Sequence, residues 1–135
     1  MSLNTVNQVG GSIITALTAT GASQATALQL ANRSGLQEIT TVASSTGVVL
    51  PAPKQPGTSI TIANQGSNTL AVYPQLGGSI DNGSTNAAVT LAAGKAATFE
   101  ASSLTNWYTV ASTGSGGATS PLGLVSAFAS RNLIF

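Results

Sequence analysis

Short alternating apolar runs, separated by Gly, Pro and Asn, fill the middle of this chain. Residues 59–64 alternate Ile with Ser, Thr and Ala, and residues 70–73 continue the pattern with Leu and Val. A period of two is typical of a strand with one buried face. Residues 64–68 are polar, and Gly66 among them can adopt a positive φ. The two runs therefore predict a β-hairpin.

Further short runs have the same character. They predict strands at residues 13–17, 39–43, 48–50, 87–91, 96–101 and 107–111, with a small bridge strand near Ile80. Residues 23–32 have two interpretations. Leu28 and Leu30 can share one face of a strand, whereas Ser23 and Gly35 also fit the N-cap and the stop of a short helix. We favour the strand.

About eight short strands without long helical patterns between them predict an all-β fold. We expect an antiparallel β-sandwich or jelly-roll-like domain with extended N- and C-terminal arms. The N-terminal arm takes residues 1–21, the domain residues 22–111, and a flexible linker and apolar C-terminal arm residues 112–135. No internal repeat is evident. The core has few large residues, so oligomerisation would add burial that one copy lacks.

The composition of the chain narrows the range of functions that we expect. The chain has no Cys and no His, which removes thiolate chemistry and the commonest general base. Only seven residues are charged, where an ordinary globular chain has about a quarter: Arg33, Glu38, Lys54, Asp81, Lys95, Glu100 and Arg131. The positive charges are scattered, so nucleic acid is not an expected partner. No run approaches the ~20 apolar residues of a membrane helix, so we expect no membrane partner either.

The few carboxylates offer little chemistry. Asp81 and Glu100 would need to lie about 5–10 Å apart over a cleft to act as a glycosidase-like pair. The simpler interpretation places Asp81 in a turn, bonded to its own backbone, and Glu100 on an exposed strand face. One such carboxylate is too little for calcium. We expect no enzyme activity, no catalytic residue, no metal and no cofactor.

The aromatic residues also have two interpretations. Tyr73, Trp107 and Tyr108 could form a platform for stacking a sugar ring. More often a strand aromatic is core, with its polar edge hydrogen-bonded. We expect Trp107 in the core, and Tyr73 and Tyr108 at a rim or interface.

An ordered set of residues runs through the core region. It comprises Gly47, Val49, Leu50, Pro51, Ile60, Ile62, Asn64, Gly66, Leu70, Val72, Tyr73, Pro74, Gly77, Ile80, Leu91, Gly94, Phe99 and Trp107. In order and spacing this set resembles a small β-domain of tailed-bacteriophage virion proteins, among them head decoration (cement) proteins. The resemblance covers residues 22–111. It implies a structural protein on the capsid exterior, often a homotrimer, that binds the major capsid protein.

The C-terminal arm is the candidate anchor, because free apolar residues at a terminus are costly to expose. The candidate partner-binding residues are Leu122, Leu124, Val125, Phe128, Leu133, Ile134 and Phe135. The arm could instead fold back on its own domain, and the N-terminal arm is a second candidate. Two other functions stay open. A tail or fibre protein would bind a host receptor or carbohydrate through loops 64–68 and 79–86, and a secreted neutral β-domain would be a stable monomer.

Overall fold

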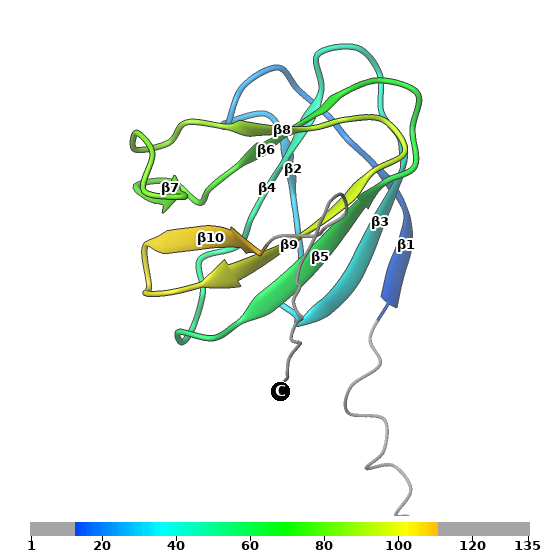
Figure 1. The fold of residues 1–135 in the computed structure, drawn as a ribbon. Coiled ribbons are helices and arrows are strands. Elements are labelled where there is room, and N and C mark those ends of the chain that lie inside the picture. The colour runs from blue at the N-terminus through cyan, green and yellow to red at the C-terminus, as the bar shows by residue number, and fades with distance from the viewer. Residues whose placement is uncertain (1–12, 111–135) are drawn as a thin grey trace, which may run out of the picture.

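The computed structural model describes residues 13–110, which form ten strands and no helix. The strands are β1 (Ile13–Thr18), β2 (Leu28–Gln29), β3 (Gly35–Thr41), β4 (Gly47–Val49), β5 (Ser59–Asn64), β6 (Leu70–Tyr73), β7 (Ser79–Ile80), β8 (Val89–Leu91), β9 (Ala96–Ala101) and β10 (Asn106–Val110). They form a six-stranded sheet in the order β1-β3-β5-β9-β10-β7 and a four-stranded sheet in the order β2-β4-β6-β8 (Figure 1). The prediction of an all-β fold is confirmed.

The first six strands form a coil. Odd-numbered strands enter the six-stranded sheet and even-numbered strands the four-stranded sheet, so each turn of the coil contributes one strand to each sheet. Successive turns are parallel: Leu36 lies opposite Ile13, and Ile60 lies opposite Gly35. One turn therefore takes about 20–25 residues, the lower end of the range for solenoid repeats. After β7 the chain reverses, and β8 and β9 add antiparallel strands beside β6 and β5.

Two sequence predictions about pairing are wrong. The sheets are mixed, not antiparallel, since five of the eight strand pairings are parallel. This coil also differs from the Greek-key path of a jelly roll. The predicted hairpin of β5 and β6 does not form. β5 pairs with β3 and β9, while β6 pairs with β4 and β8 in the opposite sheet.

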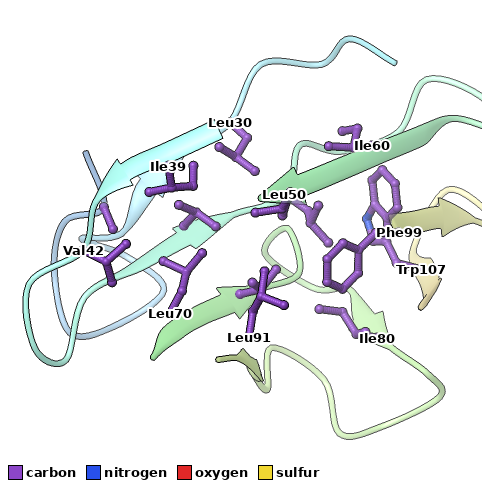
Figure 2. Close-up of a cluster of buried hydrophobic side chains, with 14 of the residues drawn as sticks. Leu30, Ile39, Val42, Leu50, Ile60, Leu70, Ile80, Leu91, Phe99 and Trp107 are labelled. Atoms are coloured by element: carbon purple, nitrogen blue, oxygen red, sulfur yellow. The ribbon is translucent and has the colours of Figure 1, made fainter. Parts of the chain in front are cut away.

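The core lies between the two sheets. Figure 2 shows side chains from both of them, such as Leu70 and Leu91 from one and Ile60, Phe99 and Trp107 from the other, packed into one cluster. The alternation in β5 and β6 correctly identified the inward residues, because every second residue in both strands is fully buried. The predicted burial of Trp107 is confirmed at 0% exposure.

Three polar side chains, those of Gln37, Asn64 and Gln75, are buried with this core. Each forms hydrogen bonds to the backbone of a segment that connects two strands. Gln37 exchanges hydrogen bonds with the backbone of Ala31, between β2 and β3. Gln75 donates to the carbonyl of Leu104, before β10. Buried polar groups need partners because an unpaired one costs about 1–3 kcal/mol. These glutamines therefore fix where the chain crosses between strands.

Asn64 explains why the hairpin fails. Its amide donates to the carbonyls of Asn68 and Leu91, both at 2.9 Å, and its side-chain oxygen accepts from Gly66 N at 3.0 Å. Gly66 packs against Val42 so closely that an added Cβ would lie 2.6 Å from the valine Cβ. The segment after β5 therefore crosses the end of the core into the opposite sheet. A hairpin turn would instead return the chain to the same sheet.

Two other local predictions, the strands near residues 28 and 13, are confirmed. Residues 28–29 form a strand, so the helical interpretation of this region is wrong. The predicted strand near residue 13 is confirmed as β1, but it belongs to the folded unit: it pairs with β3, and Ala19 after it is buried. The unit thus extends to Ile13, inside the segment assigned to the N-terminal arm. Residues 1–12 and 111–135, which include the C-terminal arm and the last residue of the predicted domain, lie outside the described residues.

Candidate interaction surfaces

The predicted partner-binding residues lie outside the described part of the chain. They are Leu122, Leu124, Val125, Phe128, Leu133, Ile134 and Phe135. The structure does describe where the chain enters and leaves the folded unit, at the start of β1 and the end of β10. β1, β3 and β5 run in one direction, β9 runs against β5, and β10 against β9. β1 and β10 therefore run the same way, and the register places Ile13, at the start of β1, in one row with Val110, at the end of β10, with β3, β5 and β9 between them.

The carboxylates of Asp81 and Glu100 are separated, and that of Asp81 is hydrogen-bonded. Asp81 and Asn82 both have positive φ, 55° and 57°, in the turn after β7. The Asp81 carboxylate accepts from Thr109 N and Thr109 Oγ1, both at 2.8 Å, rather than from its own turn as predicted. Glu100 is exposed on β9 opposite Tyr108, so β10 separates it from Asp81. The two carboxylates are not brought together over a cleft.

Glu38 has a similar role on β3. One of its oxygens accepts from Thr15 Oγ1 at 2.7 Å and the other from Gln65 Nε2 at 3.1 Å. It thereby connects the edge strand β1 to the loop after β5. Among residues 13–110 no group of three or more His, Cys, Asp or Glu side chains could hold a metal ion.

The outer face of the six-stranded sheet carries a continuous row of uncharged side chains. We call it the outer row: Ile13, Leu36, Thr61, Thr98 and Val110, each opposite the next across β1, β3, β5, β9 and β10. Its two ends are the most open, with Ile13 64% and Val110 41% exposed. In the middle, the Oγ1 atoms of Thr61 and Thr98 are hydrogen-bonded at 2.7 Å. The outer row is thus a band without charge across five strands.

The outer face of the four-stranded sheet carries a groove of about 470 Å³, open to solvent. We call it the Tyr73 groove. It is lined by Ala22, Ser44, Ser45, Thr46, Asn68, Thr69, Ala71, Tyr73 and Thr90. Its floor is formed by Ala71 and Tyr73 on β6 and Thr90 on β8, and its walls by the loops after β1, β3 and β5. None of the lining residues is charged.

The tyrosine of this groove is held in place from two sides. Tyr73 OH donates to the carbonyl of Ala22 at 3.3 Å. The ring leans over Gly47 on the neighbouring strand β4, where an added Cβ would lie 3.1 Å from Tyr73 Cε2 and 2.8 Å from the carbonyl oxygen of Ala71. Glycine at position 47 therefore provides the space that the ring occupies.

The three aromatic residues of the sequence analysis are not brought together. Tyr73 lines the groove, Trp107 is in the core, and Tyr108 is 42% exposed on the opposite sheet with its hydroxyl accepting from Asn82 Nδ2 at 2.6 Å. Tyr73 is half-buried and Tyr108 is exposed, and their expected place at a rim or interface stays a prediction. The serines and threonines of the groove had no signal in the sequence, because Ser and Thr are common throughout this chain.

No model of a known protein family matches this chain, and no curated protein matches it in sequence. Within residues 13–110 there is no helix long and apolar enough to cross a membrane.

Proposed function

We propose that this chain is a non-enzymatic structural protein of a tailed-phage virion that decorates the capsid and stabilises it by binding the major capsid protein. The observation that carries the proposal is the placement of the chain ends. A folded body whose two arms start from separate strands of one sheet, with three strands between them, can reach two neighbours at once. The resemblance to virion β-domains supports the same function, and many of its residues, such as Ile60, Leu70 and Trp107, are core positions.

The outer row adds a surface for this role. The centres of protein interfaces are depleted in charged residues, and the outer row has none across five strands. Its exposed Ile13 and Val110 offer apolar contact next to the points where the arms begin. We take the major capsid protein as the partner of this face.

Decoration stabilises a shell by mass action. A ligand that binds only the assembled state lowers its free energy by RT ln(1 + [L]/Kd), about 2.7 kcal/mol per site at a hundredfold excess over Kd. Because a shell offers many equivalent sites, modest affinity at each one is sufficient. No chemical step is needed.

The C-terminal arm is tested by its apolar residues. One variant changes Leu122, Leu124, Val125, Phe128, Leu133, Ile134 and Phe135 to Ser. A matched control has the same number of substitutions in the same part of the chain. It changes the polar residues Ser112, Thr113, Ser115, Thr119, Ser120, Ser126 and Ser130 to Asn. Binding to undecorated capsids of the phage that carries the gene, and the temperature at which decorated shells break, should fall for the first variant and not for the second. Equal binding and protection by both would exclude the arm as the anchor.

The outer row is tested separately. Thr98→Lys places a charge at its middle, and Thr85→Lys makes the same change in the exposed loop between β7 and β8. We expect weaker capsid binding for the first only. Unchanged binding would remove the outer row from the interface and leave the arm as the remaining contact.

The assembled unit that we propose is a homotrimer. Light scattering of the full chain at micromolar concentration should give three times the 13.3 kDa of one copy. A single copy in solution, together with no trimer on decorated capsids, would exclude it. The alternative function, a tail or fibre protein that binds a host receptor, is distinguished by antibody labelling of virions: label over the capsid supports decoration, and label confined to the tail refutes it.

A further inference from the structure

The Tyr73 groove has the chemistry of a ligand site and lies apart from the outer row. We propose that it binds a neutral saccharide. It lies on the four-stranded sheet, on the face of the molecule opposite the outer row. The inference therefore does not depend on where the protein sits in a virion, and either proposal can fail without the other.

The size and charge of the groove define the ligand class. Its volume of about 470 Å³ lies within the roughly 300–1,000 Å³ of small-molecule sites. Its lining includes no Lys, Arg, Asp or Glu, so nothing in it offers an ion pair to a phosphate, a sulfate or an amine. The lining therefore suits an uncharged ligand that binds through hydrogen bonds and ring contact.

The polar groups of the groove are available. Among the described residues, the hydroxyls of Ser44, Ser45, Thr69 and Thr90 make no hydrogen bond within the protein. Each hydroxyl both donates and accepts, and Asn68, whose Nδ2 donates to the Val42 carbonyl at 2.9 Å, adds its side-chain oxygen as an acceptor. A ligand that satisfies them must itself carry several groups that donate and accept, which is the property of a sugar hydroxyl.

The apolar part of the groove complements this. The negative face of an aromatic ring attracts positively polarised hydrogens, such as those on the C–H face of a pyranose. Tyr73 lines the groove together with the small side chain of Ala71. The hydrogen bond to Ala22 and the contact with Gly47 fix the tyrosine before any ligand arrives. A preformed site loses less conformational entropy on binding.

The test is a titration of the full-length ¹⁵N-labelled protein with maltotriose, cellotriose and triacetylchitotriose, with trigalacturonate as a charged sugar of the same size. We expect at least one neutral trisaccharide to shift the Asn68 side-chain and Thr69 amide signals, with a Kd of about 1 mM, typical of a shallow open site. Trigalacturonate should cause much smaller shifts.

Variants separate the groove from the rest of the surface. Tyr73→Ala should raise Kd at least about tenfold, whereas Tyr108→Ala, the same change at the exposed tyrosine of the other sheet, should leave it unchanged. Because Tyr73→Ala removes a packed ring, the double variant Thr69→Val/Thr90→Val tests the hydroxyls with the tyrosine in place and should weaken binding about threefold or more.

Three results would overturn the inference. One is the lack of any shift at the groove with every neutral probe up to about 50 mM, roughly fiftyfold above the expected Kd. Another is binding of trigalacturonate as tight as that of the neutral sugars. The last is unchanged affinity in both the Tyr73→Ala and the Thr69→Val/Thr90→Val proteins.

Discussion

Trp107 and Gln75 form a buried hydrogen bond in the core, and substitutions at these residues test how much this bond stabilises the fold. Trp107 is fully buried, and its Nε1 donates to Gln75 Oε1 at 3.0 Å. The same glutamine donates to the carbonyl of Leu104. Gly78 packs so closely on its amide that an added Cβ would lie 2.6 Å from Gln75 Cδ. The pair therefore joins the indole to the loop after β6 and to the turn before β10.

The perturbation is Trp107→Phe. It leaves the buried Gln75 oxygen without its donor, which costs about 1–3 kcal/mol, and it removes part of a buried ring, which adds a cavity term. We expect the free energy of unfolding to fall by about 2–4 kcal/mol in total. Trp107→Ala should cost about 3–5 kcal/mol. Domains have only about 5–15 kcal/mol of stability, so phenylalanine is the safer change.

The assay is urea denaturation followed by far-UV circular dichroism, because the only tryptophan has been removed. Gln75→Leu and the double variant complete a thermodynamic cycle. Residues in direct contact show coupling of about 0.5–3 kcal/mol, and we expect the double variant to lose less than the sum of the single changes. A loss below about 1 kcal/mol for Trp107→Phe, or single changes that add within about 0.5 kcal/mol, would refute the proposed role of this hydrogen bond.

Other core and backbone features give further predictions. Asn64→Ala should cost about 2–3 kcal/mol because it leaves buried backbone groups unpaired, while Ser67→Ala in the exposed loop nearby should change stability by less than about 0.5 kcal/mol; equal effects in denaturation would contradict this. Gly66→Ala should cost about 1–3 kcal/mol by overpacking, and the added change Val42→Ala should not restore it, because alanine keeps the Cβ and backbone N that lie 2.6 and 2.9 Å from the added methyl; an unchanged stability of Gly66→Ala would argue against the contact. Ala16 has a φ of 60° in β1, so Ala16→Gly should raise the melting temperature by relieving left-handed strain of about 1 kcal/mol; a lower melting temperature would show that the strain is absent.

The amino-acid sequence by itself determined where most strands lie and which of their residues face inward. Alternation in residues 59–64 and 70–73 identified the buried Ile and Val positions, because side-chain direction in a strand depends only on the local period. The single Trp in the chain was correctly placed in the core because a large aromatic residue on a strand is usually buried.

Only the tertiary structure decided which strands pair. A period of two specifies a buried face but no partner, so β5 and β6 fitted a hairpin equally well. The outcome depends on Asn64, whose amide reaches the Leu91 carbonyl 27 residues away, and no local pattern encodes that contact. The turns of the coil are similar in length but share no residue motif, which is why no repeat was evident.

Of the candidate sites, one could be predicted from the sequence and the other could not. The apolar C-terminal residues are visible in the sequence because a terminus rich in Leu, Ile and Phe is unusual in itself. The Tyr73 groove was not visible, since its members come from four separated segments between Ala22 and Thr90. The parallel coil places the loops after β1, β3 and β5 beside β6 and β8, and hydroxyl groups that are ordinary along the chain become a ligand-sized surface only when that packing gathers them around one fixed aromatic ring.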